Sequence, residues 1–244
     1  MPYSGHHSQI GQDIFTLCCL KNKRDGYFLE IGSHDAIFIN NTYLLESEYN
    51  WKGILVEYNE AFLNSYKEHR GKSRAIIDDA TKVDYRAVLE EMKFPNVIDY
   101  LQIDLEVEQG TTIQTLDLLN TTVFDTYTFR VITFEHDIYT GNYFSTRTRS
   151  RQILKSRGYV RLFSDIDGEG NHEDGGIGHD AHKRRMLNLE AMSHLSGLNE
   201  FCFEDWWVHP DHVDMDHIRK VFEGFDNSTI YNYKQILKRC IENV

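Results

Sequence analysis

Short apolar runs recur through the first half of the chain and constrain its fold more than any other feature. Each run is about five residues long, is apolar on both faces, and ends at or just before a glycine or an acidic residue. Strands with two apolar faces belong to parallel sheets that helices cover on both sides. The runs lie at 27–31, 54–57, 75–78, 100–104 and 131–135.

Segments with helical periodicity separate these runs, and the alternation predicts a doubly wound α/β sheet. Residues 8–20 and 85–92 carry apolar side chains three and four positions apart, which is typical of a helix with one buried face. Two later runs, 159–163 and 201–208, raise the number of predicted strands to seven, and a last helix is predicted near 229–242. We therefore expect a mostly parallel, Rossmann-like seven-stranded sheet.

The length of 244 residues suits one continuous domain spanning residues 1–244. Within it, residues 1–25 are predicted to form an N-terminal helical strap. Residues 165–198, which begin with many Gly, Asp and Glu residues, are predicted to form a lid-like insert between the last two strands. A calcium-binding loop starting at Asp165 is disfavoured, because Gly176 stands where such a loop requires a bidentate glutamate.

Charge and cysteine content exclude several classes of function. The formal net charge is −12 and no long basic run is present, so nucleic acid is not expected as a partner. No segment approaches the ~20 apolar residues of a membrane-spanning helix, and the N-terminus lacks a signal-peptide pattern. The four cysteines include no CxxC pair, which disfavours structural zinc and indicates a reducing, cytoplasmic compartment. The pattern specifies no oligomeric state.

Acidic residues at the ends of the predicted parallel strands form the candidate site, because ligands of such sheets bind beyond the carboxyl ends of the strands. Each could instead be a helix cap or a turn residue. The turn after the first strand has one glycine, Gly32, where a dinucleotide fingerprint has three, so NAD is not expected. A carboxylate after the second strand can accept both hydroxyls of a ribose, which suits an adenosyl ligand without phosphates, such as S-adenosylmethionine. The five acids are Glu30, Glu57, Asp78, Asp104 and Glu135.

Seven pieces of the sequence, taken together, resemble the FkbM-type S-adenosylmethionine-dependent methyltransferases over roughly residues 8–210. The resemblance implies a class I methyltransferase fold and transfer of a methyl group to a sugar or polyketide hydroxyl. The pieces are SQIGQD (8–13), GYFLEIGSHD (26–35), NNTYLLE (40–46), WKGILVE (51–57), DYLQIDLE (99–106), FRVITFEH (129–136) and DWWVH (205–209).

The resemblance also implies roles for single residues. Gly32 and Asp35 would line the methionine end of the cofactor, and Glu57 would hold the ribose. Asp78 or Asp79, after the third strand, would approach the adenine. The other positions that the motifs assign to the cofactor are Gln12, Asn41, Thr42 and Asp104, the last near the methionine amino group or the reacting centre.

Asp104, Glu135 and His136 make up the candidate catalytic centre. Metal-dependent sugar O-methyltransferases are similar here, since they place one acid after one strand and a pair of ligands after the next. Two carboxylates and an imidazole would hold Mg²⁺ or Mn²⁺, with the imidazole favouring Mn²⁺. Without a metal, His136 is the natural general base, and a third alternative is that it only caps the strand end through a backbone hydrogen bond.

The sequence thus favours S-adenosylmethionine-dependent O-methylation of a hydroxyl on a sugar, as a small molecule or within a glycan. Two alternatives stay open: methylation of a non-sugar small molecule, and a cofactor-binding but inactive interaction module. Arg147, Arg149 and Arg151 follow the fifth strand on a predicted helix. Their spacing favours a solvated helix face, with an anionic acceptor as the alternative.

Overall fold

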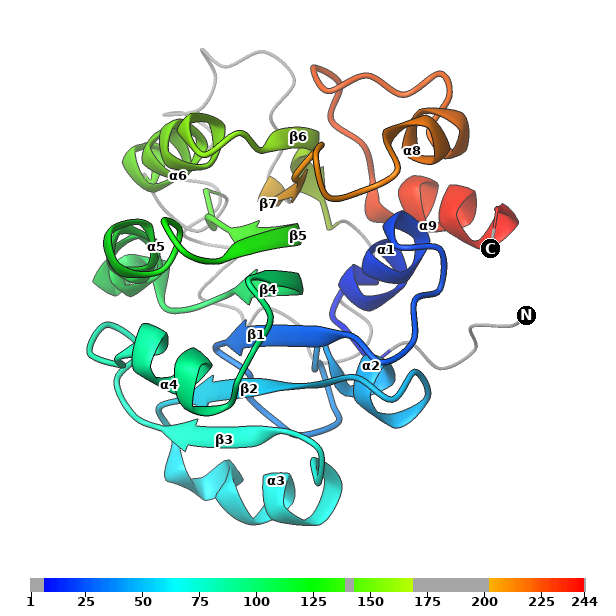
Figure 1. Cartoon of the computed structure of the whole chain (residues 1–244). Coiled ribbons are helices and arrows are strands. Elements are labelled where there is room, and N and C mark those ends of the chain that lie inside the picture. The colour runs from blue at the N-terminus through cyan, green and yellow to red at the C-terminus, as the bar shows by residue number, and fades with distance from the viewer. Residues whose placement is uncertain (1–6, 139–142, 169–201, 244) are drawn as a thin grey trace, which may run out of the picture.

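The computed structural model describes residues 7–138, 143–168 and 202–243, and its centre is a seven-stranded sheet (Figure 1). The strand order is β3-β2-β1-β4-β5-β7-β6. Strands β1 to β5 are parallel, whereas β7 runs antiparallel to both β5 and β6. The strands are β1 (Tyr27–Ile31), β2 (Lys52–Glu57), β3 (Arg74–Ile77), β4 (Val97–Ile103), β5 (Thr128–Glu135), β6 (Val160–Asp167) and β7 (Cys202–Val208).

This strand order is that of the Rossmann-like class I methyltransferase fold, so the predicted fold class is confirmed. All seven predicted strands are present, and the structure extends several of them at the amino-terminal end because their first residues already pair with a neighbour. Val97 pairs with Thr128, for example, three residues before the predicted start of each strand.

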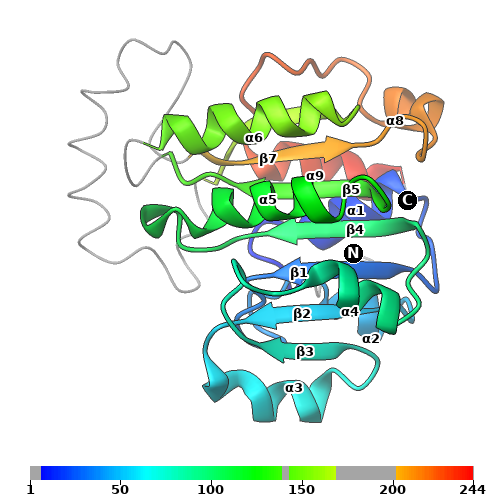
Figure 2. The same ribbon diagram turned by 60° about the vertical axis from the view of Figure 1, so that its left-hand side comes forward.

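Helices cover both faces of the sheet (Figures 1 and 2). One face carries α1 (Gln12–Cys19), α2 (Tyr43–Ser47), α8 (Met215–Val221) and α9 (Tyr233–Glu242). The other face carries α4 (Tyr85–Glu91), α5 (Thr111–Thr122) and α6 (Phe144–Ser156). Helix α3 (Leu63–His69) lies at the β3 end of the sheet. Two short 3₁₀ turns complete the described elements, Glu60–Phe62 and Val107–Gln109.

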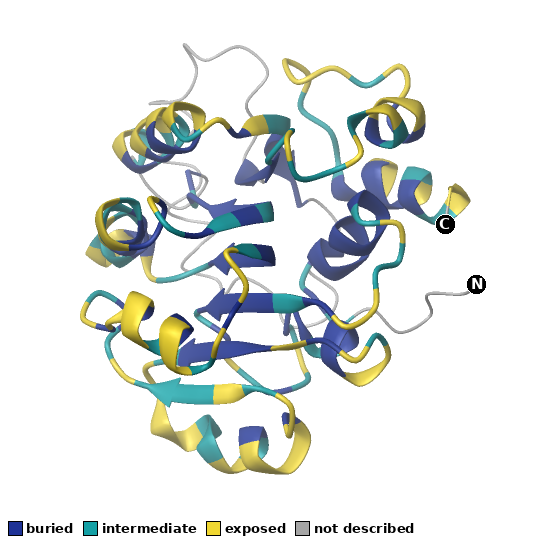
Figure 3. Cartoon of the chain, viewed as in Figure 1, coloured by how far each residue is buried: buried dark blue, intermediate teal, exposed yellow. Residues whose placement is uncertain are grey.

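Alternation along the strands divides the core into two layers, because successive side chains of a strand point to opposite faces. Phe28 and Leu55 pack in the layer under α1 and α9, whereas Leu29 and Ile54 pack in the layer under α4 and α5. Figure 3 shows the strands β1, β2, β4 and β5 as almost continuously buried and the outward helix faces as exposed. The double burial explains why the runs in the sequence are apolar on both faces.

The predicted N-terminal helix forms, but it begins at Gln12 rather than at residue 8. Gly11 precedes it with a left-handed backbone, φ 84°, which stops the helix from starting earlier. All eight residues of α1 are buried, and α1 packs against α9. The described part of the predicted strap is therefore a core element. Residues 1–6 lie outside the described residues.

The predicted insert begins later than expected. Asp165, Ile166 and Asp167 are the last residues of β6, and Ile166 still pairs with Glu204 of β7. A calcium loop starting at Asp165 is thereby excluded, since its first three positions lie in a strand. The lid-like insert remains a prediction, because residues 169–198 lie outside the described residues.

The four cysteines are free and buried, as small core residues should be. None of the described helices has both the length and the apolar character that a membrane span requires.

A close approach of two backbones fixes the turn after β1. Gly32 has φ +85°, and a Cβ atom added there would lie 1.6 Å from the carbonyl oxygen of Asp104. The Gly32 amide donates to the carbonyl of Val56 at 2.9 Å, and the Asp104 amide donates to that of Ile31 at 3.0 Å. The turn is thus clamped between β2 and β4, and only glycine fits at its start.

Replacing Gly32 by alanine should lower the free energy of unfolding by at least about 2 kcal/mol. The left-handed backbone alone costs an L-residue roughly 1–2 kcal/mol, and the added Cβ also forces the β1 and β4 ends apart. Gly71→Ala is the matched control, because nothing lies within 4 Å of its added Cβ, and it should change stability by less than about 0.5 kcal/mol. Urea unfolding of both variants measures the difference, and equal losses would contradict the clamp.

Candidate active site

The carboxyl ends of the parallel strands bring together the turn after β1, the end of β2 and the end of β4. Glu57, the last residue of β2, accepts a hydrogen bond from the His34 amide at 2.9 Å. Asp104 follows β4 and is tied to the end of β1 through its own amide. The predicted neighbourhood of Gly32, Glu57 and Asp104 therefore exists.

Glu57 is held in place by backbone donors on both carboxylate oxygens. Its Oε2 accepts from His34 and its Oε1 from the Asn59 amide, each at 2.9 Å. Each oxygen keeps a second lone pair for another donor, such as a hydroxyl. The next side chain, Tyr58, is 80% exposed and offers a free aromatic face beside this carboxylate. A fixed acid beside an open ring has the chemistry to bind a nucleoside.

The other acids at this edge differ in how many hydrogen bonds and ion pairs their carboxylates already form. Asp35 accepts from the amides of Ile37 and Phe38, both at 2.9 Å, so its carboxylate caps its own turn. Asp78 is exposed after β3. Asp79 accepts from Thr81 and pairs with Lys82. Of the two acids predicted near adenine, Asp78 is thus the more exposed and the less engaged, with its Oδ1 accepting from the Asp79 amide at 2.7 Å.

Gln12, Asn41 and Thr42 contact buried carboxylates on the α1 face of the sheet. Gln12 donates to Glu204 at 2.9 Å. The Asn41 amide and the Thr42 hydroxyl donate to Glu30 at 2.8 and 2.5 Å. The side-chain oxygen of Asn41 is buried and has no hydrogen-bond partner among the described residues, which leaves an acceptor for a ligand or a water.

Burial governs the ionisation of these carboxyls. It raises the pKa of Glu30 to about 7, against the charge of Arg70 and the hydrogen bond from Thr42. It raises the pKa of Glu204 to about 8, against the hydrogen bonds from Gln12 and Trp206. Both groups therefore take up protons near neutral pH.

Asp104 and Glu135 form a carboxyl pair across the ends of β4 and β5, and Asp137 lies next to Glu135. Burial raises the pKa of all three carboxyls, to about 6 for Asp137, and the negative charges of Asp104 and Asp137 raise the pKa of Glu135 further. Two carboxyls can share a hydrogen bond only if one of them carries a proton. Protons in such a group are taken up and released by the coupled carboxyls together.

His136 does not join this pair, so the predicted set of Asp104, Glu135 and His136 is wrong. The imidazole Nε2 lies 3.3 Å from Asp165 and 3.5 Å from Asp205. The cause is strand alternation: Glu135 and His136 are successive residues at the end of β5, so their side chains point to opposite faces. Only one of them can face Asp104.

The cluster that His136 does join does not fit a metal ion. His136, Asp165 and Asp205 offer three ligand atoms within 4.8 Å of one another. However, Arg147 donates two hydrogen bonds to the carboxylate of Asp165, both at 2.5 Å. Arg151 donates two to the carboxylate of Asp205, both at 2.6 Å. A cation would have to displace or face two guanidinium groups. Neither the predicted metal set nor this cluster therefore supports a metal-dependent step.

The same contacts correct the expectation for the arginines. Arg147 and Arg151 lie four residues apart on α6 and so share the helix face that meets the sheet. Only Arg149 lies on the solvated face, where it pairs with Asp117. The four-residue spacing of Arg147 and Arg151 could have shown that they share a helix face. It could not have shown their partners, because Asp165 and Asp205 lie on strands that are distant in sequence.

The role of His136 as a general base is also not supported by its surroundings. Burial by itself lowers the pKa of His136, but Asp165 and Asp205 outweigh burial and raise it above its ordinary value. Burial alone would likewise raise the pKa of both aspartates, but hydrogen bonds and charges from His136 and the arginines hold them well below their usual range. His136 is therefore a buried side chain whose protonated form two aspartates stabilise, rather than a base facing a substrate. Its backbone amide donates to the Phe203 carbonyl at 2.7 Å, a sheet bond that any residue could make, so the strand-cap alternative stays untested.

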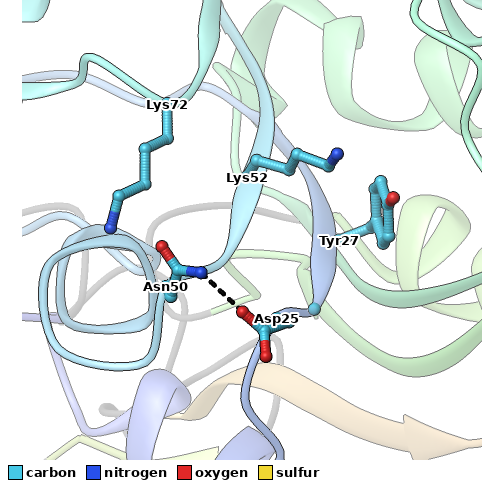
Figure 4. Close-up of a pocket in the computed structure, with 6 residues that line it drawn as sticks. Asp25, Tyr27, Asn50, Lys52 and Lys72 are labelled. Atoms are coloured by element: carbon cyan, nitrogen blue, oxygen red, sulfur yellow. Dashed lines mark hydrogen bonds between the residues drawn. The ribbon is translucent and has the colours of Figure 1, made fainter.

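A polar hollow of about 310 Å³ lies at the opposite edge of the sheet (Figure 4). There the Lys52 ammonium lies 4.8 Å from the centre of the Tyr27 ring, and the Asn50 amide donates to Asp25. Because it is formed by the amino-terminal ends of β1 and β2, it lies away from the edge where ligands of such sheets bind. Its lining residues are Asp25, Gly26, Tyr27, Asn50, Lys52 and Lys72.

Comparisons with known proteins reveal similarity at the level of structure only. No family model and no curated protein matches the sequence. Among solved structures, the chain is similar to a protein described as an rRNA-methylase from Clostridium thermocellum, at 12% identity, TM-score 0.47, and 82% and 97% coverage of the two chains. It is also similar to the plantazolicin methyltransferase BamL bound to SAH, at 12% identity, TM-score 0.43, and 82% and 83% coverage. A third is a TehB-like SAM-dependent methyltransferase from Corynebacterium glutamicum, at 11% identity, TM-score 0.41, and 73% and 86% coverage.

The His136 cluster should make stability depend on pH in one direction. The folded pKa of His136 lies above its unfolded value, so the protonated form stabilises the fold. That stabilisation is complete below the unfolded pKa near 6.5 and is lost as the pH rises through the folded pKa. The difference in melting temperature between the wild type and His136→Gln should therefore shrink from pH 6 to pH 9. A difference that is constant or grows over this range would contradict the imidazolium.

Proposed function

We propose that the chain is an S-adenosylmethionine-dependent O-methyltransferase that acts on a hydroxyl of a sugar or glycan. The observation that carries the proposal is the carboxylate of Glu57, which is held at the end of β2 against the turn that starts at Gly32. A turn with one glycine has no cradle for a pyrophosphate, whereas the acid suits a ribose. An adenosyl cofactor without phosphates meets both conditions.

The chain's own residues would bind the cofactor along the edge of the sheet. Glu57 would accept the two ribose hydroxyls, and the exposed ring of Tyr58 would stack on the adenine. Asp78, exposed after β3, would accept the adenine amino group. S-adenosylmethionine, when bound, supplies an electrophilic methyl group. The main task of the protein is then to align this group with the acceptor oxygen, which is worth roughly 7–11 kcal/mol in well-oriented reactions.

The Asp104–Glu135 pair would take the proton of the acceptor hydroxyl. A carboxylate in this pair is more basic than a free one, because burial and the second acid raise both pKa values. As the acceptor oxygen attacks the methyl group, its proton passes to the unprotonated member of the pair. A general base of this kind contributes typically 10²–10⁴-fold to the rate.

A sugar acceptor is the finer part of the proposal and rests on the sequence resemblance. Four of the FkbM-type pieces span the carboxyl ends of β1, β2, β4 and β5, which form this edge, whereas the piece at 205–209 runs along the antiparallel β7 toward the opposite edge. The two alternatives make different predictions. A non-sugar methyltransferase would turn over with another hydroxyl compound, and an inactive module would bind the cofactor without turnover.

Cofactor binding is tested with S-adenosylhomocysteine, the demethylated product. It should raise the melting temperature of the wild type, because a ligand that binds only the folded state stabilises that state. Glu57→Ala should weaken its binding at least tenfold in calorimetry, since the ribose loses both acceptors. Glu60→Ala, three residues further on at an exposed position, should bind like the wild type. If neither ligand-induced stabilisation nor heat of binding is seen with the wild type, the cofactor is wrong.

Turnover is tested with methyl-labelled S-adenosylmethionine and a panel of sugars and glycans. Asp104→Asn and Glu135→Gln should each lower kcat at least about 100-fold while S-adenosylhomocysteine binding stays within threefold of wild type. The wild-type rate should rise with pH through the first ionisation of the pair, because the doubly protonated pair holds no base and its pKa values are raised. Full activity of both variants would remove the pair from the mechanism. Loss of the activity with EDTA would show that a metal is needed after all.

A further inference from the structure

The turn after β1 holds a strained backbone. His34 and Ile39 both have a left-handed conformation, with φ of 49° and 52°. A β-branched residue such as Ile39 rarely adopts this region, so its backbone is strained there. A strained turn persists only where the surrounding structure fixes it from several directions. The side chains that hydrogen-bond to this turn are therefore needed to keep its conformation.

Four successive carbonyl groups of the turn accept hydrogen bonds from buried side chains behind it. Asn40 donates its side-chain amide to the carbonyls of Ser33 and Asp35, at 2.9 and 3.0 Å. The hydroxyl of Tyr66 donates to the carbonyl of His34. Arg70 donates to the carbonyl of Ala36 at 3.3 Å.

Two of the donors come from the carboxyl end of α3, the helix beyond β3: Tyr66 lies in α3 and Arg70 is its C-terminal cap residue. The Arg70 side chain is 0% exposed and pairs with Glu46 of α2 at 2.8 Å. Its other nitrogens donate to Asn40 at 2.8 Å and to the Thr42 hydroxyl at 2.7 Å. The guanidinium thus ties the segment between β1 and α2 to α2 itself.

Because the carbonyl groups of the turn point toward these buried donors, the N–H groups of the same peptides point to the opposite side. In a trans peptide the N–H points away from the C=O, and the chain has no cis peptide among its described residues. The carbonyl of Ser33 faces inward, and the N–H of the same peptide, on His34, faces outward and reaches Glu57. By the same rule the amides of Asp35 and Ala36 face outward, on the side where Glu57 stands. Successive outward N–H groups are suited to a carboxylate.

We propose that Tyr66 and Arg70 are positioning residues for the amino-acid end of S-adenosylmethionine. They hold the carbonyls of the turn inward, so that the amides of Asp35 and Ala36 face the cofactor carboxylate. This inference rests on the proposed function, since it assumes that cofactor. It assigns to α3, a helix outside all the motif pieces, a role in cofactor affinity that acts through the turn.

Two ligands separate this role from general damage to the fold. S-adenosylhomocysteine has the amino-acid end, whereas 5′-methylthioadenosine has the same nucleoside without it. Tyr66→Phe and Arg70→Lys should each weaken S-adenosylhomocysteine binding at least tenfold in calorimetry and leave 5′-methylthioadenosine binding within twofold of wild type. Lysine keeps the charge of Arg70 but cannot make its forked contacts. Tyr85→Phe is the control, because it deletes a similar buried bond, from the Tyr85 hydroxyl to the Ala80 carbonyl, on the other face of the sheet.

Each outcome has one meaning. Selective loss of S-adenosylhomocysteine affinity in Tyr66→Phe, with Tyr85→Phe unchanged, supports the inference even if Arg70→Lys fails to fold. Equal loss for both ligands, or no loss for either, overturns the inference and leaves the proposed cofactor standing. If the wild type binds neither ligand, the proposed function itself fails.

Discussion

The arrangement at the carboxyl ends of the parallel strands depends on one contact between two backbones. It lies where the turn after β1 crosses the end of β4. Gly32 allows the carbonyl of Asp104 to come so close that no side chain fits between them. The contact sets the direction in which the turn leaves the sheet, and with it the position of the His34 amide that reaches Glu57. The place of the proposed cofactor site, at the ends of β1, β2 and β4, follows from this packing before any side chain is considered.

Strand alternation then separates two kinds of chemistry at the end of β5. Glu135 faces Asp104, and His136 faces Asp165 and Asp205 on the opposite side. A sequence pattern of adjacent acid and histidine looks like one site, but a strand cannot present neighbouring side chains to one face. Two residues that are adjacent in the chain thus belong to different environments, one proton-exchanging and one held in fixed ion pairs.

The sequence was sufficient for the sheet because burial on both faces leaves a local signature, such as the run Phe28-Leu29 that supplies both core layers. It was also sufficient to place Gly32 and Glu57 together at neighbouring strand ends, while their roles toward a cofactor stay predictions. It did not reveal Arg70, because that residue contacts Asn40 and Glu46 across a loop and no periodicity links them. The His136 cluster was missed for the same reason, since its aspartates come from β6 and β7.

The charge balance of the buried groups decides where a proton can be exchanged. On the α6 face, His136 and two arginines surround Asp165 and Asp205, so positive charge keeps both aspartates ionised. On the α1 face, register places Glu135 opposite Glu204, and within the described parts of the chain no lysine or arginine forms an ion pair with either. Burial suppresses the ionisation of carboxyls that have no cationic partner, so it raises the pKa of both groups, to about 8 for Glu204. The base catalysis proposed for this chain would therefore belong to the α1 face of β5, on the same side as Asp104, whereas the α6 face contributes a rigid ionic support.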